Sequence, residues 1–205
     1  MHVEFLIEEP SCEAALKLLL PKIGLTEPHT FTAHVFQGKA DLLKSLPDRL
    51  TGYSKWLPDD WRIVVLVDRD DEDCKVLKAK LEKTASTAKL STRTNRGAKG
   101  TYQVVNRICI EELEAWFFGD VEALCKAYSR VPPTLDKKSA FRDPDAVSGG
   151  TWERLERVLK DAGHYAAGLP KIEAARRIAE HMEPERNRSK SFRVFRDAVR
   201  ELINA

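Results

Sequence analysis

The sequence predicts an α/β protein with an open, mostly parallel sheet flanked by helices and a helical C-terminal extension. Up to residue 120, four short apolar segments typical of strands alternate with helical segments, which is the pattern of a parallel sheet. After residue 120 only helical patterns occur. We therefore expect residues 1–120 to form the sheet domain and residues 121–205 to form a helical, basic C-terminal region.

The four expected strands are short and apolar. Residues 3–7 (VEFLI) and 62–67 (RIVVLV) are continuous apolar runs, as expected of strands covered on both faces. In residues 30–36, Phe31, Ala33 and Val35 alternate with polar neighbours, and residues 102–110 supply the fourth strand. The β-branched run at 62–67 is the clearest candidate for a central strand.

The helices are predicted from caps and apolar spacing. The first would begin with Ser11 as its N-cap and be limited by Pro21. A second covers residues 41–50, and a third, with Leu77 and Leu81 on one face, follows Asp73 as its cap. Later helices are expected at 121–128, 152–162, 172–182 and 192–203, with a loop rich in proline and glycine at 131–150.

Composition narrows the class of protein. Four widely spaced cysteines without a Cys-x-x-Cys pair argue against a zinc knuckle or a disulfide scaffold and favour a reducing compartment. No apolar run reaches membrane-spanning length, and the first strand leads straight into Glu8 and Glu9, which leaves no signal-peptide core. We expect a cytoplasmic protein without a membrane partner. Because no P-loop or dinucleotide fingerprint is present, any ATP hydrolysis would come from a partner.

Three of the apolar segments end in carboxylates. Glu8 follows the first, Asp68 and Asp70 follow the run at 62–67, and Glu112 and Glu114 follow the last. In an open parallel sheet such residues gather beyond the carboxyl ends of the strands. Carboxylates at close range raise one another's pKa unless a cation neutralises them, and oxygen ligands select Mg²⁺ or Mn²⁺. The sequence therefore predicts a Mg²⁺ (or Mn²⁺) site built from these five residues.

Basic residues concentrate in two other segments. Residues 84–110 contain no acidic residue, and their loop at 91–101 is rich in Gly, Lys and Arg. Residues 186–192 (RNRSKSF) precede a helix that either Ser189 or Ser191 can cap. Both segments are candidates for sequence-independent phosphate contacts. The predicted nucleic-acid-binding residues are Arg93, Arg96, Lys99, Arg186, Arg188 and Lys190.

The order of these motifs resembles the TOPRIM domain of topoisomerases, primases and the overcoming-lysogenization-defect nucleases. LIEEPSCE is similar to the TOPRIM form in which a strand ends in Glu-Gly-Pro-Ser, so Glu8 matches the invariant Glu while Glu9 replaces the Gly. VLVDRDDED supplies Asp68 and Asp70. The resemblance implies a metal-dependent site at these positions.

Two further residues are matched to the nuclease branch of that family. Glu112-Leu113-Glu114 resembles its metal-proximal acid, and either Glu can correspond. Lys171 resembles its later lysine, which would stabilise transition-state charge; a solvated surface lysine is the alternative interpretation.

Over nearly the whole chain, EEPSCEAAL, VFQGKADLL, LEAWFFGD and PERNRSKSFRVFRDA resemble the domain-of-unknown-function 4276 family. Its members are TOPRIM-like proteins often encoded beside an ATPase in phage-defence loci. The resemblance implies nucleic acid (DNA or RNA) as substrate and an AAA/ABC-type ATPase as partner. A homodimer is a separate expectation.

The leading hypothesis is Mg²⁺-dependent hydrolysis of phosphodiester bonds by a two-metal mechanism. Asp68, Asp70 and Glu114 would hold Mg²⁺, and Glu8 would bind the second metal or act as general base. A TOPRIM ribonuclease acting on tRNA and a non-catalytic nucleic-acid-binding or regulatory subunit of an ATPase complex stay open. An Asp-x-Asp phosphotransferase of the haloacid-dehalogenase type is disfavoured, because its motif follows the first strand, and so is a receiver-like domain, whose residue set is not identified.

Overall fold

A computed structural model describes residues 1–98 and 100–204 of the chain. Its centre is a four-stranded sheet in the order β2-β1-β3-β4, in which every neighbouring pair is parallel. The predicted α/β class and parallel sheet are confirmed. The strands are β1 (His2–Ile7), β2 (Thr30–Val35), β3 (Trp61–Asp68) and β4 (Val104–Cys109).

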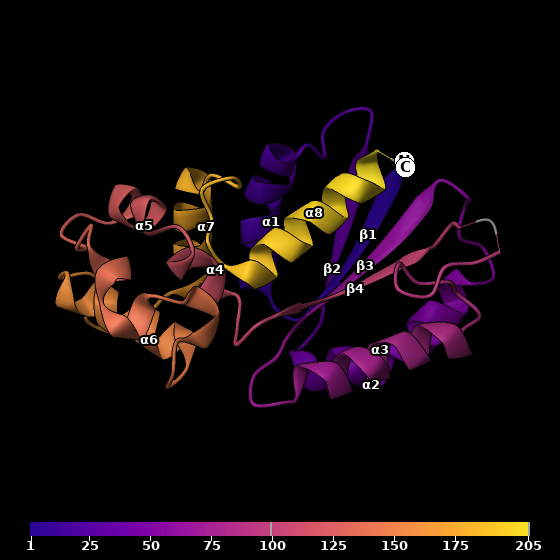
Figure 1. Cartoon of the computed structure of the whole chain (residues 1–205), viewed down its shortest axis with the longest axis horizontal. Coiled ribbons are helices and arrows are strands. Elements are labelled where there is room, and N and C mark those ends of the chain that lie inside the picture. The colour runs from indigo at the N-terminus through magenta and orange to yellow at the C-terminus, as the bar shows by residue number, and fades with distance from the viewer. Residues whose placement is uncertain (99, 205) are drawn as a thin grey trace.

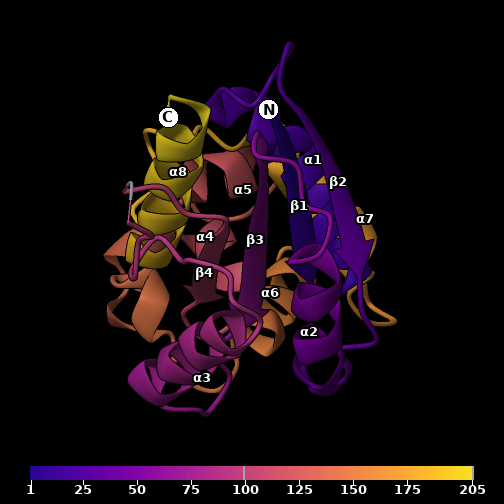
Figure 2. The same cartoon turned by 90° about the vertical axis from the view of Figure 1, so that its right-hand side faces the viewer.

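Helices cover both faces of the sheet (Figures 1 and 2). On one face α1 (Pro10–Ile23) and α8 (Lys190–Ile203) bury Leu16, Leu19 and Phe195 against the strands. On the other face α2 (Lys39–Tyr53) and α3 (Cys74–Thr87) bury side chains that include Leu46 and Leu81. These apolar stripes recur at helical spacing, which is why the central strands are apolar on both sides.

The strand order contains a topological switch point between β1 and β3. The chain leaves β1 toward β2 on one side of the sheet and leaves β3 toward β4 on the other. Ile7 pairs with Leu66 in the parallel register, so Glu8 and Asp68 emerge close together at the carboxyl edge. Open α/β sheets bind their ligands at such a crevice.

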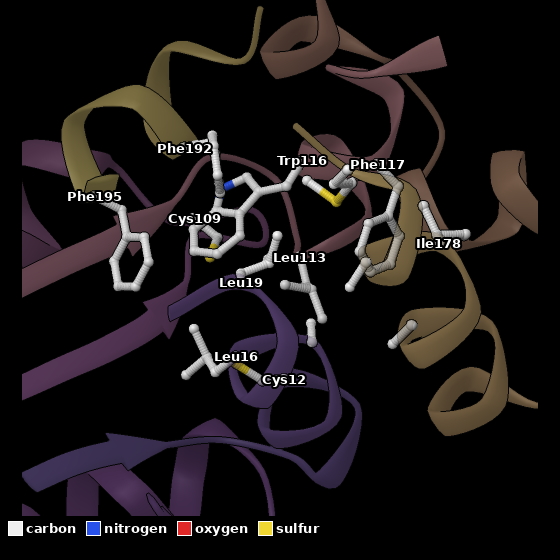
Figure 3. Packing of buried hydrophobic residues seen from close by; sticks show 14 of the residues in the cluster. Cys12, Leu16, Leu19, Cys109, Leu113, Trp116, Phe117, Ile178, Phe192 and Phe195 are labelled. Carbon is white, nitrogen blue, oxygen red and sulfur yellow. The ribbon is translucent and has the colours of Figure 1, made fainter. Parts of the chain in front are cut away.

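The remaining helices lie beyond the carboxyl ends of the strands (Figure 1) and share one hydrophobic core with the sheet. Trp116, Phe117 and Phe118 are buried in that core, and Figure 3 shows the packing of the first two. The core therefore joins the predicted regions 1–120 and 121–205. None of the helices described has the length and apolar character needed to cross a membrane. The helices beyond the carboxyl ends of the strands are α4 (Glu114–Phe118), α5 (Val121–Ala127), α6 (Thr151–Asp161) and α7 (Lys171–His181), with short 3-10 turns at Leu135–Lys137, Ser139–Phe141 and Pro144–Ala146.

The predicted ends of α1 were wrong. Glu9 is the N-cap and Pro10 occupies the first turn, where a missing N–H costs nothing, while the Ser11 hydroxyl donates to the Glu9 carboxylate at 2.7 Å. Pro21 lies inside the last turn, and the helix continues to Gly24, whose φ of 114° ends it. By contrast, Asp73 caps α3 and Ser189 caps α8, as expected.

Candidate functional site

Glu8 and Asp68 form the centre of an acidic cluster at the switch point. Glu8 Oε1 accepts the backbone N–H of Asp68 at 2.6 Å, which ties the end of β1 to the end of β3. Burial, together with the charge of Asp70, raises the pKa of Glu8 to about 7. Burial and the charges of Glu8 and Glu114 raise the pKa of Asp68 well above its usual range. Each carboxylate thus makes ionisation of its neighbours more costly.

Glu114 completes this cluster from the first turn of α4. Its side chain is only 2% exposed, and its Oε2 atom is buried without a hydrogen-bond partner among the described residues. Burial raises the pKa of Glu114 to about 7; Lys171 opposes the rise, while Glu112 and Glu9 add to it. An ionised oxygen buried without a partner is costly unless a proton or a cation neutralises it.

Asp70 lies to one side of the cluster. Its φ of 49° turns the chain sharply after β3, and its backbone N–H donates to the Glu111 carbonyl at 3.0 Å. Its carboxylate is 50% exposed and lies 3.2 Å from the Nζ atom of Lys39, which also pairs with Glu72 at 2.8 Å. The chain therefore turns directly after β3, and Lys39 already neutralises the Asp70 carboxylate.

The structure separates the two glutamates that the sequence left undecided. Glu112 Oε2 accepts the Thr151 hydroxyl at 2.8 Å and the Trp152 backbone N–H at 3.0 Å, so this carboxylate holds the N-terminus of α6. Glu114 has no comparable bond on Oε2. Of the two, Glu114 is the residue available to a ligand.

Lys171 lies beside the acidic cluster. It is the first residue of α7, and its Nζ atom lies 3.9 Å from Glu9 Oε2 and 4.9 Å from the centre of the Trp152 ring. Its charge also lowers the pKa of Glu114. The side chain is 34% exposed, so a cationic group faces both the carboxylates and solvent.

Glu9 has ordinary backbone geometry at the end of β1. Its φ of −143° and ψ of 160° are extended values that any residue adopts. A glutamate at this position therefore introduces no backbone strain.

The basic loop after α3 is tied to α8. Arg93 Nη2 lies 2.6 Å from Glu201, Arg96 pairs with the same carboxylate, and the Tyr102 hydroxyl donates to it at 3.2 Å. Lys99 lies outside the described residues. The pairing lowers the pKa of Glu201 and offsets part of the positive charge that the sequence assigned to phosphate binding.

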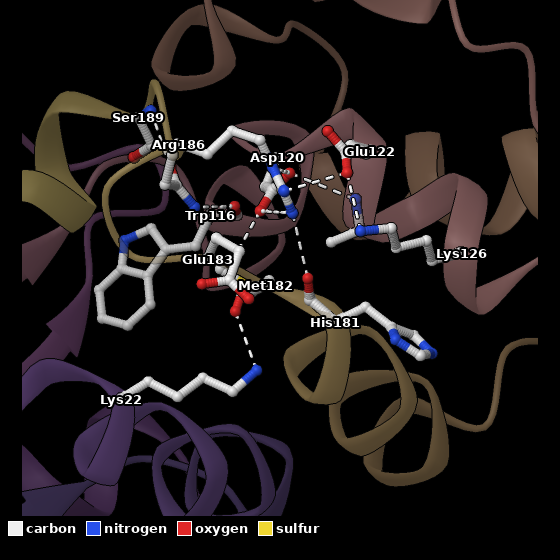
Figure 4. A network of polar contacts seen from close by, with 12 residues as sticks. Lys22, Trp116, Asp120, Glu122, Lys126, His181, Met182, Glu183, Arg186 and Ser189 are labelled. Carbon is white, nitrogen blue, oxygen red and sulfur yellow. Dashed lines mark hydrogen bonds and ion pairs between the residues drawn. The ribbon is translucent and has the colours of Figure 1, made fainter.

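Arg186 belongs to an internal network instead of a free basic surface (Figure 4). Its Nε and Nη2 atoms donate to the two oxygens of buried Asp120 at 2.7 and 2.9 Å. Asp120 also accepts the backbone N–H groups of Ala123 and Glu183. This network fastens the segment before α8 to the start of α5.

The other two residues of the basic segment differ from each other. Arg188 Nη1 lies 3.2 Å from Asp136. Lys190 begins α8, is exposed, and forms no ion pair within the part of the chain that the structure describes. Lys190 is therefore the one described member of residues 186–190 whose cation is not already paired.

Sequence reasoning missed several neighbours of the site. Lys39 and Trp152 reach it from α2 and α6. Two buried thiols, Cys12 and Cys109, also lie close to it (Figure 3), and burial, together with the charge of Asp68, raises the pKa of each thiol. Lys39 was detectable, because it follows β2 and therefore starts at the same edge of the sheet. The other three depend on contacts between distant segments.

The carboxylates of this cluster are suitable ligands for a hard cation, but they do not yet surround a common point. Among residues 1–98 and 100–204, no three His, Cys, Asp or Glu side chains already surround a common point as metal ligands. The unpartnered oxygen of Glu114 and the mutual repulsion of Glu8 and Asp68 are the features that favour a cation. Any metal would have to draw these oxygens together.

Fold and site together define an α/β protein with an acidic cluster at the switch point of an all-parallel sheet. A model for the family named Domain of unknown function (DUF4276) matches residues 7–202. The chain therefore belongs to the DUF4276 family. No curated protein and no solved structure matches it.

Proposed function

We propose that this protein binds Mg²⁺ or Mn²⁺ at Glu8, Asp68 and Glu114 and hydrolyses phosphodiester bonds of nucleic acid. The observation that carries the proposal is the buried, unpartnered oxygen of Glu114 in a cluster of carboxylates. A divalent cation offsets the cost of that arrangement, and hard oxygen ligands favour these two ions. The position at the switch point, where open α/β sheets bind ligands, supports the same conclusion.

Each side chain has a role that follows from its place. Asp70 is 50% exposed and can rotate from Lys39 toward the cluster as a further ligand. Bound at the cluster, Mg²⁺ would supply Lewis acidity to the scissile phosphate. Glu8 would either stay a metal ligand or accept the proton of the attacking water, and Lys171 would neutralise charge that develops on the phosphate. Water attacks phosphorus, the leaving sugar oxygen takes a proton, and the products are one phosphate end and one hydroxyl end.

A second function is a nucleic-acid-binding subunit that does not cut. The Lys39–Asp70 ion pair favours it, because an acid already neutralised has less need of a metal. An ATPase partner and a homodimer stay predictions. Both DNA and RNA stay candidate substrates.

The test is to incubate the purified protein with plasmid, single-stranded DNA and total RNA in Mg²⁺, Mn²⁺ or EDTA. We expect cleavage with a divalent ion and none in EDTA. Asp68→Asn and Glu114→Gln should each slow it on the order of 100-fold. Asp73→Asn is the matched control, since this exposed acid only caps α3. Cleavage by Asp68→Asn at the wild-type rate would contradict the site, and cleavage of no substrate would favour the second function.

A further inference from the structure

A basic cavity lies in the C-terminal helical region, apart from the acidic cluster. It has a volume of about 200 Å³ and lies between the outer face of α6 and residues 130–141. Its rim carries four basic side chains against one acidic side chain, Asp161. The basic residues are Arg130, Lys138, Arg154 and Arg157.

Most of this positive charge is not neutralised by the protein. Arg154 donates to the Ser148 carbonyl at 2.9 Å. Within residues 1–98 and 100–204, Arg130, Lys138 and Arg157 form no ion pair, not even with Asp161 on the same rim. In this respect the cavity differs from the basic segments around Arg93 and Arg186, whose cations are paired. Unpaired cations around a hollow favour an anion such as phosphate.

Arg130 is held over the cavity by backbone geometry. Its own φ is 66°, in the left-handed region that non-glycine residues seldom adopt. Its guanidinium lies across Gly163, where an added Cβ would come 2.5 Å from Nη2 and 3.0 Å from Cζ. Gly163 therefore leaves the space that this guanidinium occupies. A strained residue positioned without a protein partner is typical of a binding site.

The inner surface of the cavity is apolar. It is formed by Pro132, Leu135, Phe141, Val158 and Ala162. A phosphate alone would not bury such a surface, whereas a phosphate attached to a planar ring would satisfy both parts. Nucleotides have this combination, and unpaired bases pack against apolar and guanidinium groups.

We infer that this cavity holds one unpaired nucleotide, with its phosphate on Arg130 and Arg157 and its base against the apolar surface. The inference rests on the proposed function for the identity of the ligand as part of a nucleic-acid chain. The geometry agrees, because the N-terminus of α6 is fixed to Glu112, two residues from Glu114. From Trp152 to Arg157 is a rise of about 8 Å along the helix. The cavity therefore lies along the same helix whose N-terminus is bound to the motif that contains Glu114.

The test measures binding in EDTA, where no cleavage occurs, so that its result does not depend on catalysis. The probes are a fluorescent single-stranded oligonucleotide, its blunt duplex, an abasic strand of equal length and a free nucleoside monophosphate. We expect wild type to prefer the single strand over the duplex and the abasic strand. Arg157→Ala and Arg130→Ala should each weaken binding about ten-fold. Lys160→Ala is the matched control, since it removes an exposed cation of α6 that does not line the cavity.

A second variant separates position from charge. Gly163→Ala keeps every charge but must displace the Arg130 guanidinium, so we expect it to weaken binding as Arg130→Ala does. Its thermal unfolding is measured alongside, and Arg157→Ala, at an exposed residue, gives a result even if Gly163→Ala unfolds. Equal binding by wild type, Arg130→Ala and Arg157→Ala, or equal binding of intact and abasic strands, overturns the inference. Binding of the free nucleotide as tightly as the strand keeps the nucleotide site but assigns it to a free ligand.

The two proposals fail separately. Cleavage that needs Asp68, with oligonucleotide binding unaffected by Arg157→Ala, would remove the cavity and leave the proposed function. Binding that needs Arg157, without cleavage of any substrate, would support the cavity and remove the nuclease.

Discussion

Glu114 and Asp120 are two buried carboxylates six residues apart, and they differ in how their charge is satisfied. Asp120 is 1% exposed and receives Arg186 on both oxygens as well as two backbone N–H groups. Glu114 is 2% exposed and keeps one oxygen without a partner. Burying a charge is tolerable when it is fully hydrogen-bonded and costly when it is not. This difference supports the proposal that Asp120 contributes to stability and that Glu114 binds a cation.

The largest expected effect on stability comes from replacing Asp120, the fully hydrogen-bonded carboxylate. Asp120→Ala removes both oxygens to which the Arg186 fork donates, leaves Arg186 with the exposed Glu122 as its only ion-pair partner among the described residues, and removes the cap of α5. It should therefore lower the free energy of unfolding by about 3 to 5 kcal/mol. Urea unfolding measures this change. Divalent-ion binding by the protein that stays folded should be unchanged. A loss below about 1 kcal/mol would mean that the network contributes little.

Replacing Glu114, the carboxylate with an unpartnered oxygen, is expected to raise the free energy of unfolding instead of lowering it. A rise in pKa from 4.5 to about 7 corresponds to about 3 kcal/mol. Because the folded protein holds this proton more tightly than the unfolded chain, its stability falls as pH rises from about 4.5 to about 7. Glu114→Gln removes the charge and should therefore stabilise the metal-free protein at about pH 8, by up to about 3 kcal/mol.

The same variant should show little of this gain at about pH 4, where Glu114 is largely protonated in both states. Urea unfolding in EDTA at the two pH values measures the difference. If Glu114→Gln destabilised the protein equally at both, the glutamate would be a structural residue like Asp120.

The smallest effect on stability is expected from replacing Glu112, which lies in the same motif as Glu114 and tests the difference between the two glutamates. Glu112→Ala removes the acceptor at the N-terminus of α6 and should cost about 1 kcal/mol of unfolding free energy. Cation binding should persist, because the variant leaves Glu8, Asp68 and Glu114 in place. Loss of binding in a folded Glu112→Ala protein would reverse the assignment of the two glutamates.

The sequence predicted the positions of residues that directly follow the strands. Glu8 and Asp68 follow continuous apolar runs, and the rule for parallel sheets placed them at one edge before the strand order was known. The strands and the later helices were predicted within a few residues for the same reason, since their apolar spacing is local.

What the sequence could not predict depends on partners far along the chain. Arg186 was expected to contact phosphate, but its partner Asp120 lies 66 residues earlier. Glu112 and Glu114 are equivalent in the sequence, but only Glu112 accepts hydrogen bonds from the N-terminus of α6, about 40 residues later. The predicted ends of α1 were wrong because Pro10 already fits the first helical turn and Pro21, which was expected to limit the helix, fits the last. Pairing across such separations is set by tertiary packing.

The central claim is that the cluster of Glu8, Asp68 and Glu114 is a divalent-cation site. Calorimetric titration of Mg²⁺ and Mn²⁺ into wild type, Glu114→Gln and Glu112→Gln at about pH 8 tests it most directly. We predict saturable binding to wild type and Glu112→Gln, with binding to Glu114→Gln weakened at least ten-fold. No binding to wild type, or equal binding to Glu114→Gln, would contradict the claim.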